Sequence, residues 1–403
     1  MIVFPVAADP ALTVVMVTWG SAGWVTRSLG ALVDNTRPPY EVVIVDNASA
    51  DGTVEILDTE VGGATVVRNR SNLGFGVASN VGALHARAPL VCFLNPDAFV
   101  PAGWAEPILR AFEDPSVAAV GPMLLNPDGT VQEAGVVVSG DGHPIQFGHG
   151  DPPSVHAANR RAPAVSGACM TVRASDFEAA GGFDPLYHPA YNEDVDLCLT
   201  LRHVLGRDVL YCSEVRVPHV GQTSVRAGRA DGLMARHSDV LRDRWSPFLS
   251  GVAPLTELLG RRSAYWAARD SLTVERVLVL EPTLPQLETV AGLAARRPDV
   301  RVTVAGPTLP DDPVWAAGAG AAGIEVAAAG DLGSWLDARR AHYTVVATPA
   351  GRLGEENESV VRSTQPGADW VDVAGLEGKL PARSSAVAPA LPALPALIGP
   401  SGG

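Results

Sequence analysis

The chain has 403 residues, enough for two domains, and 47% of them are hydrophobic against 18% charged, which is a globular composition. The formal net charge of −14, without any basic stripe, argues against a nucleic-acid partner. The N-terminus has no basic segment and no long apolar one, so no signal peptide is expected. No stretch reaches the roughly 18 apolar residues of a membrane span.

Four cysteines, Cys92, Cys169, Cys198 and Cys212, stand in apolar runs, and none forms a Cys-x-x-Cys pair. This usage predicts buried, reduced thiols in a cytoplasmic protein.

Residues 13–123 alternate short apolar runs with segments long enough for helical crossovers. Such alternation is typical of a parallel sheet that helices cover on both faces, where ligands bind beyond the carboxyl ends of the strands. Asp46, Asn69 and Asn95 lie at such ends. The strands are predicted at 13–18, 41–46, 65–69, 90–94 and 117–121.

Residues 124–245 are less regular. The pattern predicts a hairpin arm at 129–139, a strand at 166–174, an amphipathic helix over 193–206, two short strands at 208–213 and 215–221, and a helix over 230–245.

The alternation restarts at residue 275 and predicts a second, smaller α/β domain. Gly318, Gly320 and Gly323 match GxGxxG there, but a dinucleotide turn follows a strand and opens a helix, whereas this run precedes a strand-like one. A helix or turn of small residues is the better interpretation. The expected organisation is a catalytic domain over 1–245, a helical linker over 246–274, the small domain over 275–375 and a Pro/Ala-rich flexible tail over 376–403.

The stretch VDNASADGT places Asp46 at the end of the second predicted strand. A carboxylate there can accept a hydrogen bond from the N3–H of uracil or thymine, which cytosine lacks. Local turn chemistry at residues 47–52 is the alternative, and it leaves Asp46 unexplained.

In NLGFG, Gly74 and Gly76 flank Phe75 just before a predicted helix. Glycine lets a ligand approach the backbone closely, and the helix start offers N–H groups to an anion. An ordinary turn explains the same glycines.

In FLNPDAF, Asp97 follows a buried strand, on the same sheet edge as Asp46. A hard divalent cation takes carboxylate and substrate phosphate oxygens. The alternative, a cap of the helix expected near Pro101, is poorly spaced. His219 follows a short strand, and it is either a partly buried histidine or a ligand that needs others nearby.

Glu193, Asp194 and Asp196 lie at a predicted helix start. Acidic residues there suit the helix dipole, but capping does not explain three acids after Tyr191 and Asn192. An ionised carboxylate can act as a general base. Glu193 and Asp196 share one helix face by their spacing, while Asp194 points elsewhere.

Together these motifs resemble the family-2 inverting glycosyltransferases of GT-A fold, in particular the rhamnosyltransferase-like and galactofuranosyltransferase-like bacterial branch. The resemblance covers roughly residues 12–245. It is carried by VVIVDNASADGT, NLGFGVASN, LNPDA, SGACMTVRASDFEAAGGFD, NEDVDLCLTLR and HVGQTS in family order. Residues 275–375 faintly resemble the first Rossmann-like half of GT-B glycosyltransferases, which implies a non-catalytic domain.

The resemblance also implies roles for single residues. Asp194 matches the catalytic base, and Asp97 with His219 matches a site for Mg²⁺ or Mn²⁺. Trp19-Gly20 stands where the family usually has Tyr-Asn, which alters the donor-pocket wall. The donor-nucleotide residues implied are Thr18, Asp46, Asn72, Gly74, Asn95 and Asp97, and the acceptor residues are Glu193, Tyr191 and Trp19.

The implied activity is metal-dependent transfer of a sugar, with rhamnose favoured, from a UDP- or dTDP-sugar to a hydroxyl of a glycan, lipid-linked or small-molecule acceptor. A role in cell-wall or polysaccharide biosynthesis, in the cytoplasm or at the inner face of the membrane, follows from the resemblance. Peripheral membrane contact and a homodimer stay open. Two alternatives are a degenerate nucleotide-sugar-binding scaffold and a nucleotidylyltransferase. A nucleotidylyltransferase usually needs a basic Gly-rich loop near the first strand. Residues 18–30 contain glycines but only one basic residue, Arg27.

Overall fold

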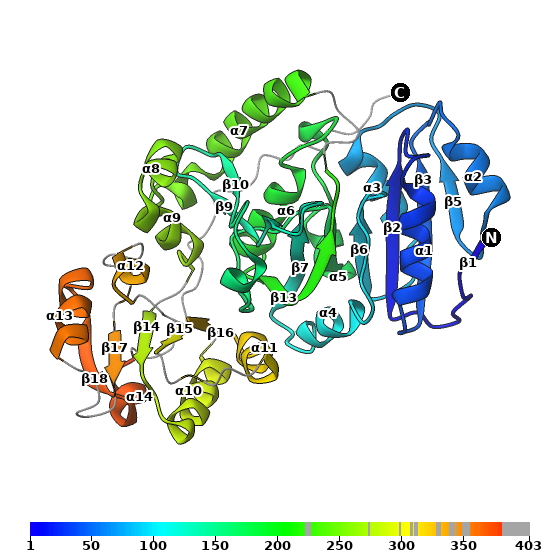
Figure 1. Ribbon diagram of the computed structural model, residues 1–403. Coiled ribbons are helices and arrows are strands. Elements are labelled where there is room, and N and C mark those ends of the chain that lie inside the picture. The colour runs from blue at the N-terminus through cyan, green and yellow to red at the C-terminus, as the bar shows by residue number, and fades with distance from the viewer. Residues whose placement is uncertain are drawn as a thin grey trace.

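The computed structural model shows two α/β units, each built around its own sheet (Figure 1). It describes residues 1–221, 227–272, 275–297, 300–306, 309, 313–327, 332–337, 343, 345–348 and 355–380. The last three residues of the HVGQTS motif and the predicted tail beyond residue 380 lie outside these ranges.

A nine-stranded sheet forms the core of the N-terminal unit, in the order β11-β13-β7-β12-β6-β2-β3-β5, with β8 paired to β7. All five strands predicted within residues 13–123 are present, and the last of them runs on to Leu125. The strands are β2 (Leu12–Thr18), β3 (Tyr40–Asp46), β5 (Thr65–Arg68), β6 (Leu90–Leu94), β7 (Val117–Leu125), β8 (Val131–Glu133), β11 (Arg160–Arg161), β12 (Cys169–Arg173) and β13 (Asp208–Pro218).

The central strands are buried on both faces, as a sheet between two layers of helices requires. Along β2, Val14 and Met16 join one apolar cluster while Val15 and Val17 join the other, which follows from the period of two. All four cysteines are buried free thiols, as predicted. The helices of this unit include α1 (Val25–Asn35), α2 (Thr53–Thr59), α3 (Phe75–Ala83), α4 (Ala105–Ala111), α5 (Ala174–Ala179) and α6 (Glu193–His203).

Strand β12 runs antiparallel between β6 and β7. Its first residue, Cys169, pairs with Leu94, the last residue of β6. The turn that leads into β12 therefore lies at the carboxyl edge of the parallel strands, where a ligand would bind.

Two sequence predictions in this unit are wrong in detail. The two short strands expected at 208–213 and 215–221 form one strand, β13, whose pairing with β7 is irregular between Cys212 and Arg216. A bulge lets one strand continue past such a break. Helix α6 is not amphipathic but buried on most sides, because Leu197 and Leu201 are as buried as Val195.

Three helices between residues 227 and 269 pack on the N-terminal unit. Helix α7 (Ala227–Leu249) contributes Leu241 and Trp245 to the main apolar cluster. Within the described ranges, no helix joins the length and apolar composition needed to cross a bilayer. Helices α8 (Leu255–Gly260) and α9 (Arg262–Arg269) pack on the hairpin of β9 (Val136–Val138) and β10 (Pro144–Gln146). Shorter elements are β1 (Ile2–Val3), β4 (Val61–Gly62), η1 (Pro153–His156) and η2 (Pro185–Tyr187).

The C-terminal unit has a five-stranded, fully parallel sheet in the order β16-β15-β14-β17-β18. Its chain starts at the centre and winds outward first on one side and then on the other, which is the Rossmann-like topology predicted. The strands are β14 (Glu275–Leu280), β15 (Val300–Ala305), β16 (Ile324–Ala327), β17 (Val345–Thr348) and β18 (Asp369–Asp372). The helices are α10 (Leu284–Arg296), α11 (Pro313–Ala321), α12 (Leu332–Asp337), α13 (Glu355–Thr364), η3 (Val373–Gly375) and α14 (Leu376–Lys379).

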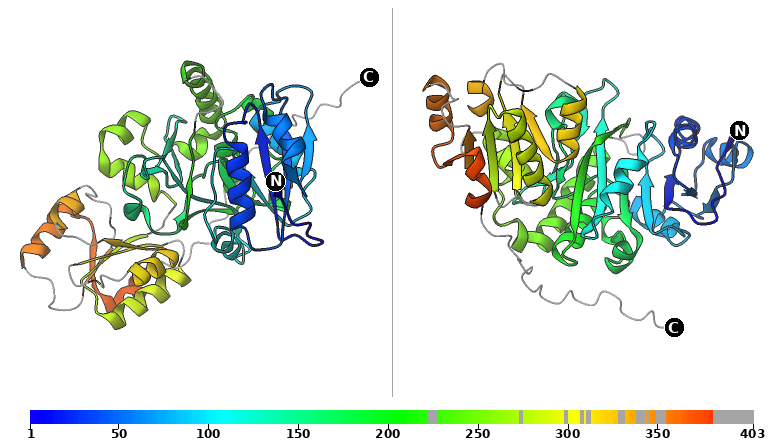
Figure 2. Two further views of the ribbon diagram at one scale, coloured as in Figure 1. Left: turned by 45° about the vertical axis from the view of Figure 1, so that its right-hand side comes forward. Right: turned by 90° about the horizontal axis from the view of Figure 1, so that it is seen from below.

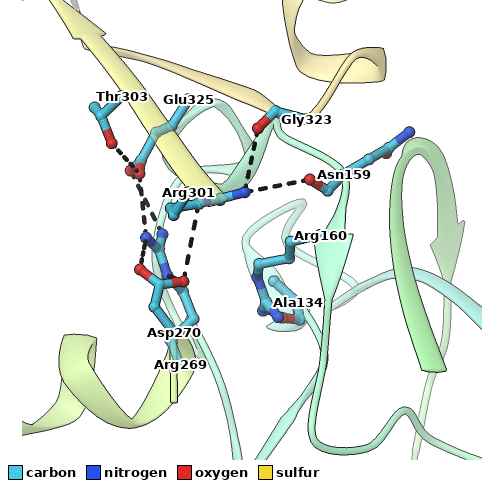
Figure 3. Close-up of polar contacts among 9 residues, drawn as sticks. All are labelled: Ala134, Asn159, Arg160, Arg269, Asp270, Arg301, Thr303, Gly323 and Glu325. Atoms are coloured by element: carbon cyan, nitrogen blue, oxygen red, sulfur yellow. Dashed lines mark hydrogen bonds and ion pairs between the residues drawn. The ribbon is translucent and has the colours of Figure 1, made fainter. Parts of the chain in front are cut away.

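The two units lie side by side (Figure 2). They meet through a buried cluster of charges (Figure 3). Arg269, at the end of α9, bonds the adjacent Asp270 through Nε at 2.9 Å and reaches Glu325 of β16 at 3.1 Å. Arg301 of β15 donates to the carbonyl of Asn159 at 3.2 Å. Because these four charged residues are at most 6% exposed, removal of one would leave another uncompensated.

The GxGxxG sequence lies at this interface. Gly318 and Gly320 belong to α11, and Gly323 follows it, so no strand-to-helix phosphate turn forms and the predicted small-residue interpretation is confirmed. A Cβ on Gly320 would stand 1.9 Å from the carbonyl oxygen of Ala157. The Gly320 carbonyl in turn accepts the N–H of Asn159 at 2.8 Å.

This contact predicts opposite effects for two substitutions in one helix. Gly318→Ala meets no atom within 4 Å and should stabilise the chain by about 1 kcal/mol through helix propensity. Gly320→Ala should destabilise it by about 1–3 kcal/mol, because a backbone atom must move. Denaturant unfolding of both variants, with limited proteolysis near residue 270, measures the difference. Equal effects of the two substitutions would contradict the contact.

Candidate active site

The carboxyl ends of β2 and β3 place Thr18 and Asp46 side by side in register. The Thr18 hydroxyl donates to Asp46 Oδ1 at 3.1 Å, and the Ser49 N–H donates to Oδ2 at 3.2 Å. Asp46 is only 2% exposed. It is thus a fixed, buried carboxylate at the predicted edge. Trp19, which follows Thr18 in the chain, is 42% exposed.

Asn47 joins two loops that the sequence separates. Its Nδ2 donates to Asn72 Oδ1 at 2.8 Å and to the Gly74 carbonyl at 3.2 Å. Its Oδ1 accepts the Leu73 N–H at 2.9 Å and the Asn69 side chain at 3.0 Å. The sequence analysis gave Asn47 only a local turn, since nothing in its pattern points to partners more than 20 residues away.

The loop of Gly74 packs directly on the segment before α6. Gly74 has φ 78°, and a Cβ there would lie 2.4 Å from the carbonyl oxygen of Pro189. Phe75 donates its N–H to that oxygen at 2.8 Å. Glycine is therefore required at this position both for the backbone conformation and for the close approach.

Asp97 and His219 meet across the sheet edge. His219 Nε2 lies 3.3 Å from Asp97 Oδ1 and 3.3 Å from Asn95 Nδ2. A single bridge pairs Ala98 with His219, and Gly221 donates its N–H to Asp97 Oδ2 at 3.0 Å. The pairing of these two short segments fixes both side chains in place.

Gln132 of β8 orients His219. Its Nε2 donates to the His219 carbonyl at 3.2 Å and to Asn126 Oδ1 at 3.5 Å, so its Oε1 is the atom that faces His219 Nδ1 at 2.6 Å. Nδ1 then carries the proton, and a neutral ring presents its Nε2 lone pair toward Asp97. Sequence reasoning missed Gln132, which lies 87 residues before its partner.

Two acceptors that face one another at 3.3 Å fit a cation between them. Imidazole nitrogen and carboxylate oxygen are ligands of Mn²⁺, and carboxylate oxygen suits Mg²⁺ as well. Within the part of the chain that the structure describes, no group of three or more His, Cys, Asp or Glu side chains gathers as a complete metal site. Asp97 and His219 could thus hold a cation only with ligands from elsewhere.

Asp194 lies at the first turn of α6 and faces the turn before β12. The Gly167 N–H donates to its Oδ2 at 2.7 Å, and the Val195 N–H donates to its Oδ1 at 2.8 Å. Burial raises the pKa of Asp194 above its ordinary value, and these N–H groups work against that rise. A half-buried carboxylate with a raised pKa has the character of a general base.

The other two acids of the EDVD motif behave differently. Asp196 accepts hydrogen bonds from Tyr187 at 2.9 Å and Trp245 at 2.8 Å, and it pairs with Arg244 at 2.7 Å. It therefore anchors α7 and does not act together with Glu193 on one free face. Glu193 is 6% exposed, its Oε2 has no hydrogen-bond partner, and burial with the neighbouring Asp194 raises its pKa well above the ordinary value.

Tyr191, the remaining predicted acceptor residue, has φ 80° in the segment before α6. Its carbonyl contacts Nδ1 of the buried His237 of α7 at 3.0 Å. The roles of Tyr191, Glu193 and Trp19 toward an acceptor stay predictions.

The turn before β12 links Asn95 to Asp194. Asn95 donates its N–H to the Ala168 carbonyl at 2.9 Å, and the preceding residue, Gly167, binds Asp194. Ser166, one residue earlier, donates its N–H to Oε1 of Glu133 at 3.0 Å. Glu133 is a second residue that the sequence analysis missed, because a hairpin arm gives no signal for it.

The family model described as "Glycosyl transferase family 2" matches residues 13–175. That range contains β2 to β12 and therefore Asp46, Asp97 and the turn at Gly167. Asp194 and His219 lie beyond it.

Curated relatives extend the match. The N-acetylglucosaminyl-diphospho-decaprenol L-rhamnosyltransferase of Mycobacterium tuberculosis is 29% identical over 301 residues, 68% of this chain and 94% of that protein. The O-antigen biosynthesis protein RfbC of Myxococcus xanthus is 31% identical over 235 residues, 56% of this chain. The chain spans less than a quarter of two curated relatives that it matches, 23% and 18% of their lengths.

Among solved structures, a mannosyltransferase from Pyrobaculum calidifontis in complex with GDP-Man and Mn²⁺ aligns with a TM-score of 0.43 at 20% identity. The alignment covers 72% of this chain and 81% of that one. Residues 13–175 of the N-terminal unit thus match glycosyl transferase family 2, the family that its motifs resemble.

Proposed function

We propose that the protein is a metal-dependent, inverting glycosyltransferase that moves a sugar from a UDP- or dTDP-sugar to an acceptor hydroxyl. The observation that carries the proposal is that one turn connects Asp194 to Asn95, whose side chain contacts His219. The turn of Gly167 and Ala168 binds the base on one side and Asn95 on the other. Family membership supplies the reaction class.

The donor nucleotide would lie along the carboxyl edge of β2, β3 and β6. Asp46 there keeps lone pairs beyond the two hydrogen bonds that it accepts, so it can take the N3–H of uracil or thymine. Thr18 fixes that carboxylate. Asn72 and Gly74, which Asn47 holds in place, would line the donor at the start of α3.

In the transfer step, Asp194 accepts the proton of the acceptor hydroxyl while the hydroxyl oxygen attacks the anomeric carbon. The bond from that carbon to the diphosphate oxygen breaks, and the nucleoside diphosphate leaves with the electron pair. One displacement inverts the anomeric configuration and needs no covalent intermediate. General-base help of this kind contributes about 10²–10⁴-fold to the rate.

Asp97 and His219 would hold Mg²⁺ or Mn²⁺, with the donor diphosphate as the ligand source that the protein lacks. Such a cation neutralises charge on the leaving diphosphate. Gln132, at Nδ1 of His219, keeps the ring in the tautomer that this role needs, and Asn95 lies at the other nitrogen, Nε2.

Rhamnose is the sugar that the relatives favour, since the M. tuberculosis relative that matches over 94% of its length is named a rhamnosyltransferase. Its name also favours a lipid-linked acceptor and hence polysaccharide biosynthesis at the inner face of the membrane, with the chain in the cytoplasm and in peripheral contact with lipid. Glu193, Tyr191 and Trp19 are the proposed acceptor side. A homodimer stays a proposal without support from the described contacts.

A screen of nucleotide sugars with Mg²⁺ or Mn²⁺, repeated with EDTA, tests the proposal. We expect turnover of a UDP- or dTDP-sugar with release of the nucleoside diphosphate. EDTA should abolish this turnover. Tight donor binding in calorimetry without turnover would instead favour a degenerate binding scaffold. Release of pyrophosphate would favour nucleotidylyl transfer.

The base assignment predicts that Asp194→Asn lowers kcat by about 10²–10⁴-fold while donor affinity changes little. The asparagine oxygen can still accept the Gly167 N–H, so the turn should keep its shape. Steady-state kinetics and calorimetry measure the two quantities. Glu178→Gln, exposed on α5, is the matched control. Normal turnover of Asp194→Asn would exclude this base.

The cation assignment predicts that Asp97→Asn and His219→Ala weaken the same metal dependence of donor binding. Gln132→Met has the length of glutamine but frees the tautomer of His219, so it should weaken metal affinity by about 10–100-fold. Metal titrations at fixed donor concentration measure the effect, with exposed Asp239→Asn as the control. Unchanged metal affinity in the His219 variant would rule out His219 as a ligand.

A further inference from the structure

Strand β8 is three residues long, and its successive side chains serve opposite parts of the site. Gln132 contacts His219, whereas Glu133 points to the other face and lies against the turn before β12. Glu133 is 2% exposed, and the side chain of Gln146 lies near it. The mechanism above makes no use of this buried acid.

Glu133 and Asp194 bind adjacent backbone amides of one turn. The Ser166 N–H donates to Glu133 Oε1 at 3.0 Å, and the next N–H, that of Gly167, donates to Asp194 Oδ2 at 2.7 Å. These two carboxyl groups lie close enough to interact, with Glu133 buried and Asp194 half-buried. Ionising both at once is costly there, because like charges repel strongly at low dielectric.

The charges around Glu133 do not compensate for two negative groups. Helix α6 directs Asp194 and the thiol of Cys198 toward it, and Glu193 adds a third acid beside Asp194. Among the ion pairs of the described residues, none includes Glu133, Glu193 or Asp194.

The cation that faces Glu133 is Arg160 of β11. Its guanidinium donates to the carbonyl of the neighbouring Ala134, as Figure 3 shows, and does not bond the carboxyl itself. Burial and the nearby Asp194 together raise the pKa of Glu133 to about 8.

We propose that Glu133 is a positioning residue of the active site that holds a proton in the ground state, so that Asp194 alone presents a negative charge to the acceptor. The inference rests on the proposed function in naming Asp194 as the base. Glu133 touches no reacting atom. It acts through the shared turn and through its own charge state.

The donor supplies the reason for such an arrangement. A nucleoside diphosphate brings at least two negative charges to the same sheet edge. A second ionised carboxylate beside Asp194 would repel it, whereas a protonated Glu133 keeps the turn in place without adding charge. Above the pKa of Glu133, the second charge appears and donor binding weakens.

The first experiment measures stability and requires no substrate. For an acid whose pKa is raised on folding, the unfolded chain releases its proton near pH 4.5 while the folded chain keeps it up to about pH 8. The stability contribution of Glu133 therefore falls as the pH rises between these values. Glu133→Gln, which mimics the protonated form, does not have this loss.

We expect the Tm of Glu133→Gln minus that of the wild-type chain to grow from pH 5 to pH 8, by at least about 3 °C. Glu178→Gln should show a constant difference. A constant difference for Glu133→Gln would overturn the proposal. If Glu133→Gln does not fold, Asp194→Asn provides the test. Removal of the Asp194 charge must lower the pKa of Glu133, so the pH at which the Tm of the chain stops falling must move to a lower value. An unchanged pH would refute the coupling of the two carboxyl groups.

The second experiment is the pH profile of kcat/KM for the donor. The wild-type chain should lose activity above about pH 8. Glu133→Gln should lack that alkaline fall, which a purely structural role of Glu133 would leave in place. A fall that persists in Glu133→Gln contradicts the proposal. If no donor is turned over by the wild-type chain, the proposed function fails, while the stability test still decides the state of Glu133.

Discussion

The antiparallel insertion of β12 between β6 and β7 is the constraint on which the site depends. A purely parallel sheet offers only strand ends at its carboxyl edge, whereas β12 offers its beginning there. The turn before Cys169 therefore presents N–H groups to two carboxyl groups and a carbonyl to Asn95. Backbone groups of one short turn thus connect Asp194 and Glu133 to Asn95, whose side chain contacts His219.

Support for this edge comes from segments that are distant in sequence. Asn47 holds the loop of Gly74, and Gln132 holds His219, in each case with two or more hydrogen bonds from one side-chain amide. Amides suit this task because each offers both donors and acceptors without charge. Neutral side-chain amides thus fix the shape of this edge around the carboxylates Asp46 and Asp97.

Sequence patterns predicted what is local and missed what is not. Apolar runs located the strand ends, and those ends place Thr18, Asp46 and Asp97 on one edge because parallel strands share their direction. Gln132 and Glu133 could not be predicted, since their importance depends on partners 87 and 33 residues away. The amphipathic prediction for α6 failed for a related reason: helix α7 covers the side that spacing alone assigned to solvent, with Arg244 and Trp245 bound to Asp196.

The charge cluster at Arg269 changes how the C-terminal unit should be regarded. Asp270 closes the last helix before that unit, yet Arg269 divides its hydrogen bonds between Asp270 and Glu325, which belong to either side of the boundary. In a chain truncated near residue 275, Arg269 would thus lose Glu325 as an acceptor and keep Asp270. The surface that the C-terminal unit now covers would be exposed to water. The catalytic unit is not a detachable module, and exchange of such units between related enzymes would have to conserve this junction as one piece.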